Sequence, residues 1–133
     1  MPGLSDNARE LFSRPIPAWV TVVGHDGAPH NSVVWVDMDG DDVLFNTSVG
    51  RVKERILRTN PTVSVSILDP EHAGRWASVT GVAKLTTEDG DQVIDRLAKK
   101  YLGVDRYPHH TNDDQRVTVR VAVNKLIEVR PGE

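Results

Sequence analysis

The chain has 133 residues, 38% of them hydrophobic and 26% charged, with a formal net charge of -3 at pH 7. This length fits a single domain over residues 1–133 that buries roughly two-thirds of its unfolded surface. The absence of cysteine excludes disulfides, thiolate metal sites and cysteine nucleophiles. The small acidic excess argues against nucleic acid as a partner. No apolar stretch is long enough for a membrane span, so we expect a cytoplasmic protein.

The first third of the chain predicts a helix and then three strands. Ser5–Ser13 has near-helical apolar spacing, with Ser5 as a fair N-cap. Short turns at Asp26-Gly27 and Asp39-Gly40-Asp41 are typical of hairpins. They join three strands that we expect to form an antiparallel meander: Trp19–Gly24, His30–Met38 and Val43–Asn46.

The strand His30–Met38 is unusual because it is apolar on both faces. Val33 and Trp35 point to one face, and three other apolar side chains point to the opposite face. A barrel strand buries one face in the core, so the second apolar face indicates a partner subunit, a ligand or a packed helix.

The rest of the chain predicts two further helices and three further strands. In chain order these are helix Gly50–Arg58, strand Val63–Leu68, strand Trp76–Leu85, a helix from Thr87 to about Leu102, and strand Val117–Val129. Alternating valines give the last strand one solvated face. Six strands joined mostly by hairpins predict a mainly β protein with a closed or nearly closed antiparallel barrel.

Candidate binding residues gather where the strand Val43–Asn46 ends and the next helix begins. Thr47 and Ser48 precede a helix start whose free amides and dipole attract an anion. The alternative is that these two hydroxyls only cap the helix.

The same helix start carries Arg51, Lys53 and Arg55, which oppose the helix dipole. Lys53 falls on the apolar side of the helix, where it needs a counterion. Either a bound anion supplies that charge, or these are ordinary solvated side chains with Glu54 or an aspartate as partner.

The sequence contains no nucleophile elbow, Walker loop or dinucleotide fingerprint, and the histidines lack metal-site spacing. A bound cofactor would therefore carry any chemistry. Trp35 and Trp76 are able to wall an aromatic ring, although such residues more often lie in a core or interface. For Arg75 and Arg116 we expect surface positions, or contact with an acidic ligand tail.

Segments spread over nearly the whole chain carry a family resemblance: 29–37, 43–47 with 51–55, 69–70, and 99–108. They resemble the F420-dependent branch of the pyridoxamine-phosphate-oxidase-like split-barrel family. The resemblance implies a six-stranded split barrel with two or three helices. It also implies an obligate homodimer that holds a cofactor in each of two clefts between the subunits.

The resemblance also implies the site residues. It places the cofactor phosphate on the basic turn and the cofactor ring beside the preceding hydroxyls. The implied cofactor contacts are Asn46, Thr47, Ser48, Arg51, Val52, Lys53, Arg55, Ile56, Trp76 and Ala77, with Trp35 toward the substrate. The family usually has asparagine at the position of Ile56. Basic residues available for an acidic cofactor tail are Arg58, Lys84, Lys99, Lys100, Arg106 and Arg116.

The function implied is that of a reductase that transfers hydride between coenzyme F420 and a small organic substrate, without a protein nucleophile or a metal. Two alternatives stay open. One is an FMN-binding oxidoreductase of the same fold, since both cofactors present a tricyclic ring and a phosphate. The other is a dimer that binds a cofactor or small ligand without turnover.

Overall fold

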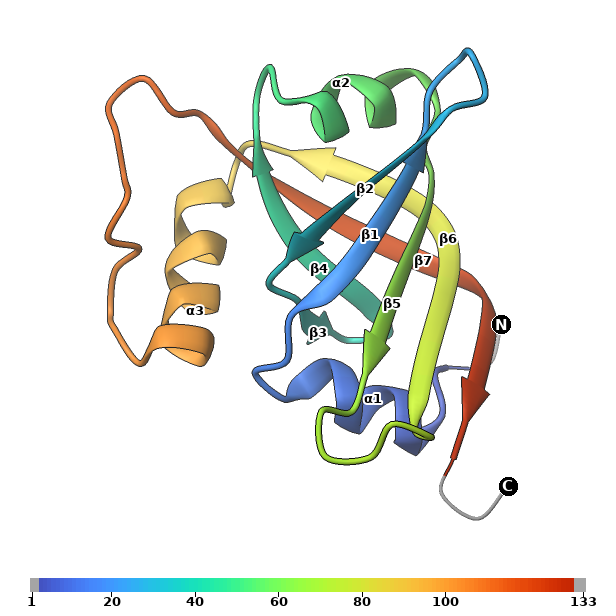
Figure 1. Ribbon diagram of the computed structural model, residues 1–133. Coiled ribbons are helices and arrows are strands. Elements are labelled where there is room, and N and C mark those ends of the chain that lie inside the picture. The colour runs from blue at the N-terminus through green and yellow to red at the C-terminus, as the bar shows by residue number, and fades with distance from the viewer. Residues whose placement is uncertain (1–2, 131–133) are drawn as a thin grey trace.

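A seven-stranded antiparallel sheet forms the body of the protein in the computed structural model, which describes residues 3–130 (Figure 1). The strands are β1 (Ala18–Val23), β2 (Pro29–Val34), β3 (Asp37–Asp39), β4 (Asp42–Ser48), β5 (Thr62–Leu68), β6 (Trp76–Thr86) and β7 (Arg116–Val129). The helices are α1 (Asp6–Ser13), α2 (Val52–Thr59) and α3 (Gly90–Leu102). The strand order is β2-β1-β5-β6-β7-β4-β3.

The predicted strand His30–Met38 is in fact two strands, β2 and β3, which form the two edges of the sheet. Only Trp35 and Val36 connect them, so the edges lie close together and the sheet curls into a split barrel that hydrogen bonds do not close. Both predicted hairpins are present, as β1–β2 and β3–β4, but their middle strand is divided, so they do not form one continuous meander and the described strands number seven instead of six.

Side chains of α3 bind the backbone at this gap. The Tyr101 hydroxyl accepts the N–H of Val36 at 3.0 Å and donates to the carbonyl of Ile16 at 2.7 Å. Lys100 Nζ donates to the carbonyls of Phe12 and Val36 at 2.8 and 2.5 Å. These bonds replace those that a neighbouring strand would provide.

The two apolar faces of this segment now have separate explanations. Val36 is fully buried in the barrel core, whereas Trp35 packs with α3 residues Val93 and Leu97. Val33, in contrast, is 52% exposed on the outside of the sheet. A packed helix thus covers Trp35, and Val33 is left without cover from its own chain.

The inside of the barrel is filled by alternate strand residues, chiefly valines, as the period of two requires. Helix α1 covers one end of the barrel and α2 the other (Figure 1). Leu11 and Phe12 of α1 are fully buried, and Leu57 of α2 is nearly so. Burying side chains of this size contributes roughly 1.5–3 kcal/mol each.

The helix predictions are confirmed apart from their N-terminal boundaries. Ser5 caps α1 by accepting the N–H of Ala8 at 3.1 Å. Helix α3 begins at Gly90 and not at Thr87, because its first turn packs tightly on β7: a Cβ at Gly90 would collide with the backbone carbonyl of Arg116.

The solvated face predicted for the last strand is only partly present. Helix α3 packs against β7 and β4, so Thr118 is fully buried. Arg120 next to it is held by ion pairs with Asp39 and Asp89 at 2.6 and 2.7 Å. On the apolar side of α3, Val93, Ile94, Leu97 and Ala98 are buried, Tyr101 is half-buried and Leu102 is 51% exposed.

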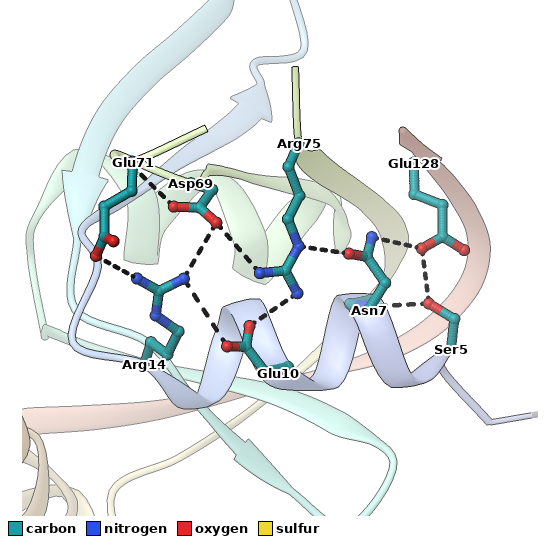
Figure 2. A network of polar contacts seen from close by, with 9 residues as sticks. Ser5, Asn7, Glu10, Arg14, Asp69, Glu71, Arg75 and Glu128 are labelled. Carbon is teal, nitrogen blue, oxygen red and sulfur yellow. Dashed lines mark hydrogen bonds and ion pairs between the residues drawn. The ribbon is translucent and has the colours of Figure 1, made fainter. Parts of the chain in front are cut away.

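A network of charged side chains ties α1 to the sheet (Figure 2). Arg75 donates to Asn7 and Glu10, at 2.8 and 2.9 Å. Arg14 and Arg75 both pair with Asp69 at 3.2 Å. Arg75 is therefore a structural residue, not a free surface side chain. None of the described helices is long and apolar enough to cross a membrane.

Candidate functional site

The basic turn lies at the barrel end covered by α2. Strand β4 ends at Ser48, and Arg51 is the N-cap of α2 without a side-chain cap bond. Thr47 and Ser48 belong to β4, so neither hydroxyl caps the helix. The first amides of α2 are left for another partner.

Glu54 does not balance the charge of Lys53. Its carboxylate accepts the N–H of Gly50 at 2.8 Å and the Nε–H of Arg58 at 2.7 Å. These bonds, that from Arg58 first, lower the pKa of Glu54. This carboxylate therefore stays ionised and is fully used by its own helix.

Lys53 is half-buried, as its place on the helix predicted, and its Nζ donates to the Ser32 hydroxyl at 2.9 Å. Within residues 3–130, neither Lys53 nor Arg51 forms an ion pair. Burial first, and then the charges of Arg51 and Arg116, lower the pKa of Lys53. The ammonium is thus held close to other cations and has no carboxylate within ion-pair distance in the described part of the chain.

Arg116 is buried, which corrects the surface position expected from sequence. Its Nε donates to Asn46 Oδ1 at 2.8 Å, and its Nη1 donates to Ser48 Oγ and Asp114 Oδ2 at 3.0 Å each. The Tyr107 ring lies 5.3 Å from the guanidinium carbon. These contacts fix Arg116 at the base of the site.

Two neighbouring cavities open at this end, and Arg51 and Lys53 line both. The inner cavity has a volume of about 240 Å³ and is lined by Pro17, Val33, Val34, Trp35, Asn46, Thr47, Arg51, Lys53, Ile94, Leu97, Tyr107 and Arg116. The outer cavity has a volume of about 450 Å³ and is lined by His30, Asn31, Ser32, Gly50, Arg51, Val52 and Lys53.

Aromatic rings form one side of the inner cavity. Trp35 stacks on Tyr101 with centroids 5.4 Å apart and meets Tyr107 edge-on at 6.0 Å. Burial raises the pKa of Tyr101 to about 12, so its hydroxyl stays neutral. Thr47 Oγ1 is buried and has no hydrogen-bond partner within the described residues. An apolar, aromatic cavity with a free polar group can hold a planar organic ligand.

Sequence comparison identifies the family of this fold. The family model for pyridoxamine 5′-phosphate oxidase matches residues 4–130. The chain belongs to this family. The resemblance found in the sequence is thus confirmed at the level of the family. No curated protein matches the chain.

Solved structures with the split-barrel fold of this family include an F420 reductase, 24% identical, with a TM-score of 0.83 over 93% of this chain and 98% of that one. A conserved hypothetical protein of Mycobacterium tuberculosis is 22% identical, with a TM-score of 0.71, and the match covers 95% and 84% of the two chains. A heme binding protein from Mycobacterium smegmatis is 17% identical, with a TM-score of 0.71, over 100% and 57%. At these identities the likeness shows the fold.

In this member of the family, most of the predicted site residues lie together. The residues that line the cavities are Trp35, Asn46, Thr47, Arg51, Val52 and Lys53, and Ser48 binds Arg116 at their base. Arg55 lies exposed on α2, and Ile56 packs against the barrel core.

Trp76 and Ala77 do not line either cavity of their own chain. They begin β6 at the α1 end of the barrel (Figure 1), and Ala77 is fully buried. Trp76 would contact a ligand at this site only from a second copy of the chain. Among the tail candidates, Arg58 pairs with Glu54 and Lys100 with Asp37.

The sequence did not predict the contacts that three residues make at the site. Ser32 accepts from Lys53, Tyr107 walls the inner cavity, and Arg116 anchors Asn46. The pairing of β4 with β7 sets Arg116 opposite Ser48. The place of Arg116 in the site follows from that register, which the sequence alone does not give.

Proposed function

We propose that this protein is an oxidoreductase that binds coenzyme F420 and transfers hydride between this deazaflavin and a small organic substrate. The observation that carries the proposal is the pair of cations Arg51 and Lys53, which form no ion pair within residues 3–130 and lie at the uncapped start of α2. The family membership and the fold shared with an F420 reductase support the same choice.

The charge of the site favours a phosphate-bearing ligand. The site contains three cations, Arg51, Lys53 and Arg116. The carboxylate near them is that of Asp114, which is ion-paired with Arg116. A phosphate in the outer cavity would neutralise Arg51 and Lys53 and accept hydrogen bonds from the first amides of α2. Arg55, exposed on the same helix, adds positive charge at longer range.

The inner cavity fits the remainder of such a cofactor and its reaction partner. Trp35 and Tyr107 offer aromatic surface, and Thr47 offers a free hydroxyl. When bound, the deazaflavin supplies the hydride chemistry. The chain contributes position and electrostatics, and we assign no nucleophile or acid–base residue to it.

A second copy of the chain completes the proposed site. Five residues that pair across β2, β1, β5, β6 and β7 form one outward row: Val33, Trp19, Ser66, Ser78 and Ile127. The three large apolar members are 49–57% exposed. Large exposed apolar side chains at both ends of one row on a sheet face favour association with a second subunit. That subunit would bring its own Trp76 to the cofactor, whereas its Ala77 is buried in the barrel core.

Cofactor titration tests the proposal. We expect F420 to bind more tightly than FMN, and F420 reduced in advance to be oxidised by members of a broad acceptor panel. Tighter binding of FMN would instead make the protein an FMN oxidoreductase. Tight binding of F420 with no turnover on any acceptor would make it a cofactor-binding dimer without enzymatic activity.

A further inference from the structure

The segment between α3 and β7, residues 103–115, runs back along α3 before it enters the sheet (Figure 1). Residues 103–113 are exposed except for Tyr107 and His110, which are half-buried. Tyr107 is the one residue of this segment that lines the inner cavity. One wall of the cavity therefore belongs to a segment that buries few side chains of its own.

The Asp95 carboxylate on α3 holds both half-buried residues through a single oxygen atom. Its Oδ1 accepts the backbone N–H of Tyr107 at 2.8 Å and lies 2.7 Å from Nε2 of His110. Burial raises the pKa of Asp95, but the hydrogen bonds from Tyr107 and His110 outweigh it and lower the pKa overall. An ionised carboxylate only accepts hydrogen bonds, so Nε2 of His110 is the donor, whether the imidazole is neutral or protonated.

The Tyr107 ring has further contacts, all with other flat groups. On the cavity side it meets Trp35 edge-on at 6.0 Å, and the guanidinium carbon of Arg116 lies 5.3 Å from its centroid. The rings of His109 and His110 meet it edge-on at 5.5 and 5.6 Å. Each contact of this kind is weak, so the place of the ring depends on where Asp95 holds the backbone.

We propose that Asp95 is a positioning residue of the binding site, whose Oδ1 holds Tyr107 and His110 so that the Tyr107 ring forms a fixed wall for the ring of the cofactor. The proposal rests on the proposed function for the identity of that ligand. Asp95 does not line the inner cavity but a separate polar cavity of about 320 Å³, together with Asp91 and His110. It therefore acts on the ligand through Tyr107.

The position of Tyr107 is measured first by NMR in the protein without cofactor. In the wild type, the Tyr107 ring should give nuclear Overhauser effects to the indole of Trp35. Asp95→Leu keeps a side chain of similar size but removes the acceptor, and we expect it to abolish these effects. Asp95→Asn keeps Oδ1 as an acceptor for both donors and should retain them. Asp91→Leu, at an exposed position one turn earlier on α3, is the matched control and should retain them too.

The same variants are then titrated with F420. Asp95→Leu should weaken binding about 3- to 10-fold, the effect of one lost contact between aromatic rings, whereas Asp95→Asn and Asp91→Leu should bind like the wild type. Tyr107→Leu should weaken binding to the same degree as Asp95→Leu. Adding Asp95→Leu to Tyr107→Leu should cause no further loss, because both changes remove the same wall. This lack of additivity separates positioning of Tyr107 from general damage to the fold.

Four results would overturn the proposal. Two concern the nuclear Overhauser effects: their persistence in Asp95→Leu, or their loss in Asp95→Asn or Asp91→Leu. The other two concern F420: unchanged affinity in Asp95→Leu, or a loss that is equally large in the Tyr107→Leu background. If F420 binds to none of these proteins, the wild type included, the proposed function fails, and the effects between Tyr107 and Trp35 alone decide whether Asp95 positions the wall.

Discussion

The two ends of the barrel each carry a pair of basic side chains, and the two pairs differ in their partners. At the α1 end, Arg14 and Arg75 each contact two carboxylates or more, drawn from Glu10, Asp69 and Glu71 (Figure 2). At the α2 end, Arg51 has no ion pair within the described residues, and Lys53 contacts only a hydroxyl.

This difference separates charges that serve the fold from charges that serve a ligand. A matched network lowers the free energy of the folded chain and needs nothing from outside. A half-buried ammonium beside other cations has the opposite effect, because it loses hydration without gaining a counterion. Such a group is maintained where a bound anion restores the balance.

The largest expected effect is on ligand binding at the α2 end. Lys53→Met keeps the apolar stem of the side chain and removes the charge. We expect it to weaken binding of F420 by about 1–3 kcal/mol, the range for a charge-assisted hydrogen bond. Calorimetric titration measures this loss, and Lys125→Met, at an exposed position of β7, is the control that should bind normally.

The same variant should not lower the free energy of unfolding of the unliganded protein, since the lost ammonium was destabilised by burial. An analogue of F420 without the phosphate should bind the variant and the wild type alike. Equal losses for both ligands would mean that Lys53 acts through the structure of the site.

The α1 end should respond in the reverse manner. Arg75→Met removes the donor shared by Asn7, Glu10 and Asp69. We expect the free energy of unfolding to fall by about 1–2 kcal/mol in urea denaturation, because these acceptors lose a partner in a part-buried setting. F420 affinity should not change. A stable variant that binds F420 poorly would reverse the roles we assign to the two ends.

The pH dependence of stability tests the role of Glu54, the carboxylate that hydrogen-bonds to the start of α2. Its bond from Arg58, and then that from Gly50, lower its pKa below the ordinary 4.5. The Glu54 carboxyl therefore binds a proton more tightly in the unfolded chain than in the folded one. Ionised Glu54 makes its full contribution to the free energy of unfolding above about pH 4.5, and this contribution is lost as the pH falls through the lowered pKa. The stability difference between wild type and Glu54→Gln should shrink from pH 7 to about pH 3. A constant difference would contradict this role.

The smallest expected effect is that of salt on the choice of cofactor. Contacts between exposed basic residues and the acidic tail of F420 are weak and screened. Raising the ionic strength should therefore weaken F420 binding roughly threefold more than FMN binding. Parallel titrations at low and high salt test this, and identical salt slopes would remove any role for the tail.

The sequence predicted most elements of the fold because their signals are local. Helix α1 follows from Ser5 and an apolar stripe, and most strands follow from alternating valines bounded by turns. The division of His30–Met38 was not predictable in this way. It depends on Lys100 and Tyr101, which come from α3 and bind the backbone at Val36.

The part of the site that is contiguous in the chain was predictable from sequence, and the part that depends on strand pairing was not. The basic turn is contiguous in the chain, so Lys53 and its need for a counterion were visible from helical spacing alone. Arg116 was misplaced, because its burial results from strand pairing that brings β7 beside β4. The proposed contribution of Trp76 depends on a second chain, which no pattern within one chain describes.

The pKa of Lys53 tests the central claim most directly. NMR titration of its side chain in the free protein should give a value below the ordinary 10.5, as burial and the neighbouring arginines require. Binding of F420 should raise that value, because the phosphate favours the charged ammonium, whereas the phosphate-free analogue should leave it low. A Lys53 pKa that stays the same when F420 binds would contradict the claim that these cations exist to hold a phosphate.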